Sequence, residues 1–82
     1  MDLKQLQYFV AIAEEGTISA AAKKLFLSQP PLSAQMKLLE RELGCVLFER
    51  GQRQIRLTEA GRQFYARAKA LLELSRAAVE VM

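Results

Sequence analysis

The side chains best suited to chemistry lie between residues 28 and 44, in the stretch SQPPLSAQMKLLERELG. Gln29, Ser33 and Lys37 recur every four residues, so a helix would place them on one side, beside the small Ala34. An amide, a hydroxyl and an ammonium form hydrogen bonds, but none of them is a ready general base. These side chains are short and mostly uncharged, so this face of the helix is predicted to contact a partner. The alternative is an ordinary core helix with a featureless outer side.

The composition argues against catalysis by this chain. It has no histidine, one cysteine and no glycine-rich phosphate loop, which excludes a catalytic triad and a zinc site. Glu40 and Glu42 are two residues apart on a helix and so point in different directions. Cys45 sits in an apolar stretch and is predicted to be a small core residue rather than a redox sensor. We expect neither an enzyme, nor a metal, nor a cofactor.

Length and charge indicate one small domain with an anionic partner. The chain has 82 residues, of which 51% are hydrophobic and 26% charged, as in a folded globular protein. It lacks an apolar run of about 18 residues and a secretory signal, which predicts a cytoplasmic protein and no membrane partner. Residues 16–70 hold ten basic and four acidic residues. This concentration favours a polyanion as partner, and a merely solubilising surface is the alternative.

Helical patterns account for the first half of the chain. Residues 3–15 carry apolar side chains at helical spacing between a capping Asp2 and a terminating Gly16. Thr17 is predicted to cap a short second helix over residues 18–26. The third helix buries Leu32, Met36, Leu39 and Leu43 and ends at Gly44. A short helix, a tight turn and a second helix form a helix-turn-helix at about residues 18–37.

Residues 46–57 are predicted to form a β wing. An apolar run at Val46–Phe48 and the alternating Ile55–Leu57 flank the polar turn ERGQRQ. A two-stranded hairpin is marginal alone, so its apolar residues should lie against the helices. The turn would then project Arg50 and Arg53 outward.

Thr58 is predicted to cap a last helix over residues 59–82, which carries a heptad-like apolar seam. Its far half would be exposed in a monomer, which predicts a homodimer, and cover by another domain is the alternative. The seam residues predicted to dimerise are Phe64, Ala68, Leu71, Leu72, Ser75, Ala78, Val79 and Met82.

Three segments in this order resemble the N-terminal DNA-binding domain of LysR-type transcriptional regulators: LKQLQYFVAIAEEGTISAAAKKLFLSQPPLS, LLERELGCVLFER and RLTEAG. The resemblance implies a mainly α fold, with a winged helix-turn-helix of three helices and a two-stranded wing in residues 1–58. Residues 59–82 would be a linker helix that pairs two such heads. It further implies sequence-specific binding of double-stranded DNA, with higher oligomers in a full-length protein. The family's effector-binding domain, and with it any small-molecule inducer, lies outside this chain.

On this interpretation the third helix reads the major groove and the wing reaches the minor groove. Gln29 can bond bidentately to adenine, and Ser33 is a less selective donor and acceptor. Pro30, Pro31 and Ala34 offer apolar contact to thymine methyl groups. Relatives often carry an arginine at the position of Ala34, so the base preference of relatives does not transfer.

The phosphate contacts are predicted from hydroxyl and ammonium groups near the two helix starts. If Ser28 is the N-cap, it cannot cap through the amides of the two prolines, which leaves its hydroxyl free. If Gln29 is the cap instead, Leu32 keeps the only amide available to it. A protein-interaction module and a plain helical dimerisation module remain alternatives. The predicted phosphate ligands are Thr17, Ser19, Lys23, Ser28 and Lys37, and the predicted minor-groove ligands are Arg50 and Arg53.

Overall fold

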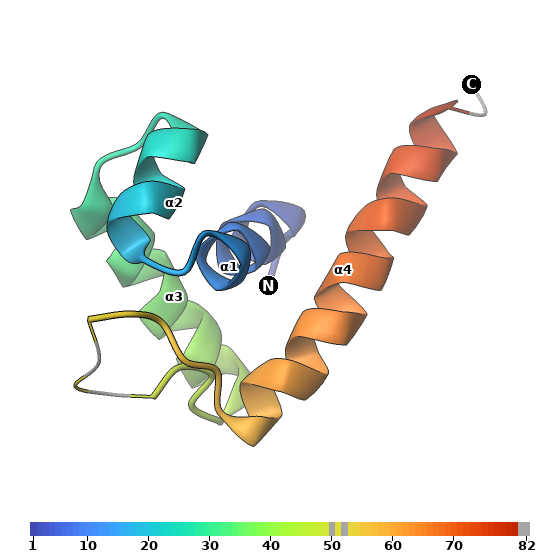
Figure 1. The fold of residues 1–82 in the computed structure, drawn as a ribbon. Helices are drawn as coiled ribbons and strands as arrows, with labels where there is room; N and C mark the ends of the chain where they lie inside the picture. The colour runs from blue at the N-terminus through green and yellow to red at the C-terminus, as the bar shows by residue number, and fades with distance from the viewer. Residues whose placement is uncertain (50, 52, 81–82) are drawn as a thin grey trace.

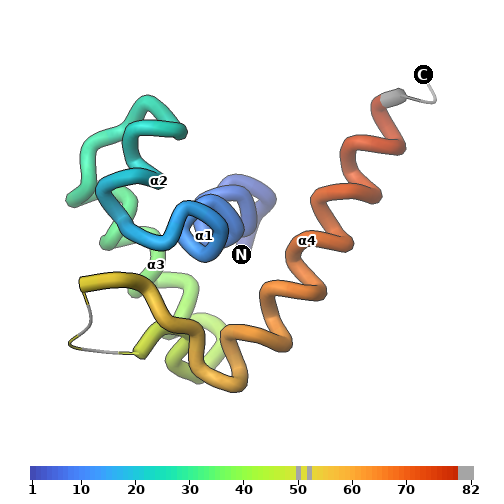
Figure 2. Tube along the Cα trace, viewed as in Figure 1, coloured from blue at the N-terminus to red at the C-terminus, as the bar shows by residue number. Residues whose placement is uncertain are grey.

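The computed structural model describes residues 1–49, 51 and 53–80, and within them the chain forms four helices. Figures 1 and 2 show α1 beside α2, while α4 leaves the body of the molecule as a projecting rod. This order confirms the mainly helical fold class. The helices are α1 (Leu3–Glu15), α2 (Ile18–Leu25), α3 (Gln29–Leu43) and α4 (Glu59–Glu80).

Local capping fixes the helix boundaries close to their predicted positions. The Asp2 carboxylate accepts a hydrogen bond from the Gln5 amide, and the Gln5 side chain accepts one from the Asp2 amide, forming a capping box. Thr17 caps α2 by accepting a hydrogen bond from the Ala20 amide at 3.0 Å. The second helix ends at Leu25, one residue earlier than predicted, because Phe26 adopts the left-handed conformation that terminates it.

The core lies where α1 meets the other three helices. Its largest fully buried side chains come from α1, α3 and the start of the wing: Phe9, Ile12, Leu32, Leu39 and Leu47. The Phe9 ring contacts Phe48 and Phe64, with centroid distances of 5.4 and 5.1 Å. One aromatic side chain of α1 therefore ties the wing and α4 to the same core. Among the described helices, α4 packs only against α1.

The wing is less regular than the two-stranded hairpin predicted from the sequence. Within the described residues it contains a single antiparallel bridge, between Phe48 and Leu57, rather than two strands. The Glu49 amide donates to the Arg56 carbonyl oxygen at 2.8 Å, and the Ile55 amide donates to that of Gly16 at 2.8 Å. The returning arm thus bonds to the turn between α1 and α2, which explains why it does not extend the ladder.

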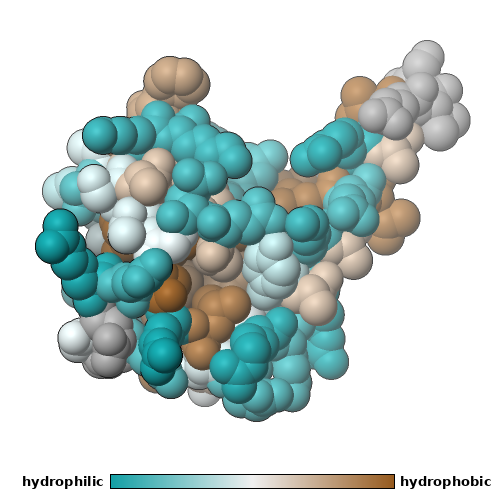
Figure 3. Space-filling model, in the orientation of Figure 1, coloured by the Kyte–Doolittle hydropathy of each residue, from teal (hydrophilic) through white to brown (hydrophobic). Residues whose placement is uncertain are grey.

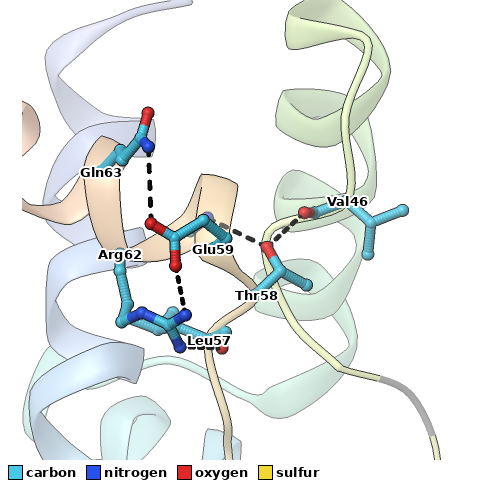
Figure 4. Close-up of polar contacts among 7 residues, drawn as sticks. Val46, Leu57, Thr58, Glu59, Arg62 and Gln63 are labelled. Carbon is cyan, nitrogen blue, oxygen red and sulfur yellow. Dashed lines mark hydrogen bonds and ion pairs between the residues drawn. The ribbon is translucent and has the colours of Figure 1, made fainter.

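Figure 4 shows how Thr58 joins the wing to α4. The Thr58 hydroxyl donates to the Val46 carbonyl oxygen at 2.6 Å and accepts from the Gly61 amide at 3.0 Å. The first turn also holds an ion pair between Glu59 and Arg62, and Arg62 donates to the Leu57 carbonyl oxygen. This confirms Thr58 as the cap. No helix in the described part of the chain is both long and apolar enough to cross a membrane.

Candidate nucleic-acid interface

The N-terminal half of α3 presents the predicted reading residues to solvent. Leu32, Met36 and Leu39 are buried and hold the opposite side of the helix on the core. Because that side of the helix is buried, the residues on the opposite side face solvent. The exposed residues are Gln29, Pro30, Pro31, Ala34 and Lys37, and Ser33 is half-buried.

The start of α3 has the unusual cap that the two prolines predict. Ser28 is the N-cap residue, with extended backbone, and its side chain makes no capping hydrogen bond. The reason is chemical, because Pro30 and Pro31 have no amide hydrogen to donate. The exposed Ser28 hydroxyl is therefore available to a partner outside the chain.

The start of the second helix lies beside the start of α3, because Thr17 and Ser19 line the same concavity as Gln29. Ala21 and Ala22 are buried, and their small side chains let α2 pack closely on its neighbours. Ser19 and Lys23 are exposed on the outer side. Thr17 uses one lone pair to cap α2, but its hydroxyl hydrogen can still be donated.

Two shallow concavities run along one flank of α3 and bring separately predicted residues together. A concavity of about 480 Å³ is lined by residues of the α2 start, the α3 start and the wing: Thr17, Ile18, Ser19, Gln29, Arg53 and Ile55. A second, of about 290 Å³, includes Ser33 and Lys37 together with Phe48 and Gly51 of the wing. The two concavities share Ile18 and Ile55, so they adjoin one another. Six predicted site residues line them: Thr17, Ser19, Gln29, Ser33, Lys37 and Arg53.

The wing is held against α3 by a residue that sequence reasoning did not single out for this role. The buried Glu40 carboxylate accepts hydrogen bonds from the Leu47 amide at 2.7 Å and the Phe48 amide at 3.3 Å. These bonds fix the start of the wing and so help to position Arg53, which is exposed. Arg50, the other predicted wing residue, lies outside the described residues.

Ion pairs engage some of the cations in the described part of the chain and leave three predicted contact cations unpaired. Lys24 pairs with Glu15 at 3.2 Å, and Lys69 pairs with Glu14 at 3.0 Å. Within the described ranges, the predicted contact cations Lys23, Lys37 and Arg53 form no ion pair, so their charge is available to an anion. Among the same residues, no three His, Cys, Asp or Glu side chains gather as a metal site would require.

The predicted dimer seam of α4 divides between two environments. Phe64 packs edge-on against Phe9, Ala68 is fully buried, and Leu72 packs against the core. The structure therefore corrects the prediction for Ala68, because α1 of the same chain already covers it. Ser75 is half-buried and Ala78 is exposed, and Met82 lies outside the described residues.

Large apolar side chains are exposed on the projecting half of α4. Leu71, Leu74 and Val79 are 45%, 67% and 71% exposed. In the space-filling view, apolar surface interrupts the polar surface along this rod (Figure 3). The part of the seam left for a partner is therefore the outer side of this half.

A polar cluster locks α4 to α1 and has no counterpart in the sequence prediction. The Glu14 carboxylate accepts hydrogen bonds from the Tyr65 hydroxyl and the Lys69 ammonium. The Tyr65 hydrogen bond, followed by that of Lys69, lowers the pKa of Glu14 below its usual range. The spacing of Tyr65 and Lys69 places them on one face of a helix, but no local signal pairs them with an acid at the end of α1.

Comparison with known proteins agrees with this arrangement. The sequence profile described as "Bacterial regulatory helix-turn-helix protein, lysR family" matches residues 3–62. The transcriptional regulator TfdS of Cupriavidus pinatubonensis is 50% identical over 80 residues, which are 98% of this chain and 27% of TfdS. The transcriptional regulator BudR of Klebsiella aerogenes is 54% identical over 80 residues, or 98% of this chain and 56% of BudR. The chain thus spans only about a quarter to a half of these relatives.

Solved structures of similar sequence share the fold. The DNA-binding domain of BenM, in its complex with benA site 1 DNA, has a TM-score of 0.96 and 46% identity, covering 99% of this chain and 94% of that one. The DNA-binding domain of CbnR, also bound to DNA, has a TM-score of 0.93 and 49% identity, covering 98% and 92%. With a family profile that matches most of its length, the chain belongs to the LysR family of bacterial regulatory helix-turn-helix proteins.

Proposed function

We propose that this chain is the DNA-binding part of a transcriptional regulator and binds duplex DNA sequence-selectively as a dimer. The observation that carries the proposal is the concavity that joins Thr17, Ser19, Gln29 and Arg53 on one surface. The complexes of the BenM and CbnR domains with DNA support it, because those domains match this chain almost end to end. Acting on bacterial DNA, such a regulator works in the cytoplasm.

In the proposed complex, α3 enters the major groove with its N-terminus leading. Gln29 reads adenine through a bidentate contact, and Ser33 adds a less selective hydrogen bond. Pro30, Pro31 and Ala34 contact thymine methyl groups. This surface offers one strong polar reader and several apolar contacts, so its preferred sites are expected to be rich in A·T pairs.

The remaining contacts anchor the protein to the DNA backbone. Ser28, Thr17 and Ser19 donate hydroxyl hydrogens to phosphates, and Lys23 and Lys37 supply charge. The wing, including Arg53 and Arg50, lies along a flanking minor groove, where a narrow A·T-rich segment attracts arginine. Residues 1–58 form this head, and residues 59–82 pair two heads through the exposed side of α4.

The first test is a fluorescence-anisotropy titration with random duplex DNA at two salt concentrations. A DNA-binding domain loses affinity steeply as salt rises, because each neutralised phosphate releases counterions. Affinity that is weak and independent of salt would instead indicate a module that binds protein or only dimerises. Site selection from a random library then supplies the specific duplex.

The second test separates reading from anchoring on the selected duplex. Gln29→Ala should cost about 1–3 kcal/mol at one base step and leave random DNA unaffected. Lys37→Ala should weaken all sequences alike and reduce the salt slope by about one. Equal losses on selected and random DNA for Gln29→Ala would remove Gln29 as a reader.

A further inference from the structure

A third concavity lies on the flank of α3 that faces away from the wing. It measures about 220 Å³ and is enclosed by the starts of α1 and α3: Asp2, Lys4, Tyr8, Leu27, Pro31 and Gln35. Gln35 and Ser33 are two residues apart, which places them roughly 200° apart around a helix. The concavities of the wing flank contain Ser33, Lys37 and Gln29, whereas this one contains Pro31 and Gln35.

A chain of hydrogen bonds fixes which end of the Gln35 amide faces outward. The Asp2 backbone amide can only donate, so it must meet the Gln5 Oε1 atom, at 3.2 Å. Gln5, which is buried, therefore turns its Nε2 atom towards Gln35 and donates to Gln35 Oε1 at 3.1 Å. The Gln35 oxygen is thereby occupied, and its Nε2 hydrogens are left as donors for an acceptor outside the chain.

Hydrogen-bond donors and one cation line this concavity, beside one carboxylate. Lys4 is exposed and, within the described residues, forms no ion pair. The Tyr8 hydroxyl is a further possible donor on the same wall. Asp2 contributes the acidic group of this lining, and its Oδ1 atom accepts from the Gln5 amide at 2.8 Å as the cap of α1. An anion at this concavity must therefore be held by Lys4 and the outward donors of Gln35, at a distance from the Asp2 carboxylate.

We infer that Lys4 and Gln35 bind a DNA backbone phosphate on the strand opposite to the one that Lys37 contacts. The inference rests on the proposed function. A major groove about 12 Å wide places a phosphate backbone on each flank of a helix lying in it. The wing flank meets one strand, and the Lys4–Gln35 flank meets the other, so that α3 is held from both sides. Gln5 acts through Gln35 as a positioning residue.

The central test is Gln35→Glu, compared with Gln7→Glu, in the 82-residue chain. Glutamate at position 35 can still accept from Gln5, so the fold is retained, but it turns a carboxylate instead of an N–H group towards DNA. Gln7 is exposed on α1 beside the far half of α4, so its variant has the same charge change away from α3. We expect Gln35→Glu to lower the affinity for selected and random duplex alike, by about tenfold more than Gln7→Glu. Equal effects of the two variants would overturn the inference.

The phosphate is identified by replacing single phosphates of the selected duplex with neutral methylphosphonates. At the contacted position, this replacement should weaken the wild-type chain and strengthen Gln35→Glu, because it removes a repulsion. A loss confined to the selected sequence, without this reversal at any phosphate, would place Gln35 on a base edge and overturn the assignment. Lys4→Ala should reduce the salt slope by about one, whereas Arg67→Ala on α4 should leave it unchanged.

A double-mutant cycle tests the positioning role of Gln5. If Gln5 acts through Gln35, the losses in DNA affinity of Gln5→Met and Gln35→Ala should not add. Additive losses would show that Gln5 has only a general structural role. If the wild-type chain itself shows no salt-dependent affinity for DNA, the proposed function fails. If it binds and the Lys4 and Gln35 variants behave as their controls do, only this inference fails.

Discussion

Replacing Gly61 with alanine should place a methyl group inside the junction between the wing and α4. A Cβ atom at this position would lie 2.2 Å from the Leu47 carbonyl oxygen and 3.2 Å from Leu57 Cβ. The Leu47 oxygen cannot easily retreat, because it accepts a hydrogen bond from the Thr58 amide at 3.0 Å. The Gly61 amide itself donates to the Thr58 hydroxyl at 3.0 Å. The atom that would clash with the new methyl group is therefore a backbone oxygen, and the residue that caps α4 holds this oxygen in place.

Two opposing effects determine the magnitude. Alanine in place of glycine within a helix stabilises it by about 1 kcal/mol. Forcing an extra carbon into a packed site costs about 1–3 kcal/mol, and more where backbone must move. Because the nearest atom is a bonded carbonyl oxygen, we expect a net loss of about 2 kcal/mol. For a domain of this size that lowers Tm by about 8–16 °C.

Thermal and urea unfolding followed by circular dichroism measure this loss. Ala66→Gly, at an exposed position of the same helix, calibrates the propensity term and should lower stability by about 1 kcal/mol. If Gly61→Ala raised stability by that amount instead, Gly61 would be only a weak point in the helix. The Leu47 carbonyl oxygen would then not be what requires glycine at this position.

Three further predictions concern the wing, the α1–α4 contact and the dimer. Glu40→Leu leaves the Leu47 and Phe48 amides without their carboxylate and should cost about 2 kcal/mol in urea unfolding, and an unchanged midpoint would contradict this. Because its contacts lower the pKa of Glu14, the stability they contribute is present above about pH 4.5 and is lost as pH falls through the lowered pKa. Melting curves between pH 6 and 3 should therefore depend less on pH in Glu14→Gln, and equal dependence would show that the contact is absent in solution. Leu74→Asp should keep the fold but yield monomers in sedimentation equilibrium, and a retained dimer would place the interface elsewhere.

Features set by neighbouring residues could be predicted from the sequence. The capping roles of Asp2, Thr17 and Thr58, and the free hydroxyl of Ser28, depend on groups within four residues along the chain. The buried side of α3 follows from helical spacing alone. These signals suffice to locate the surface that carries Gln29, because the outer side of α3 is what remains once the inner side is buried.

Features set by distant residues could not be predicted in this way. Glu14 lies next to an acidic neighbour at a helix end, where its charge is unfavourable by local rules. Its partners, Tyr65 and Lys69, are 51 and 55 residues away. The same holds for Gly61, whose function depends on the Leu47 backbone. Periodicity identifies an apolar side chain, but it does not say which surface will cover it.

One part of α4 is covered by α1 of the same chain and another part is left exposed, and this division matters for DNA binding. Phe64 and Ala68 bind α4 to α1, while Leu74 and Val79 remain exposed for a second copy. In the proposed dimer, the distance between two reading helices therefore depends on a contact within each chain as well as on the interface between chains. The Glu14 cluster is part of that contact. Changes there should alter the preferred spacing of half-sites while leaving the base preference of each half-site intact.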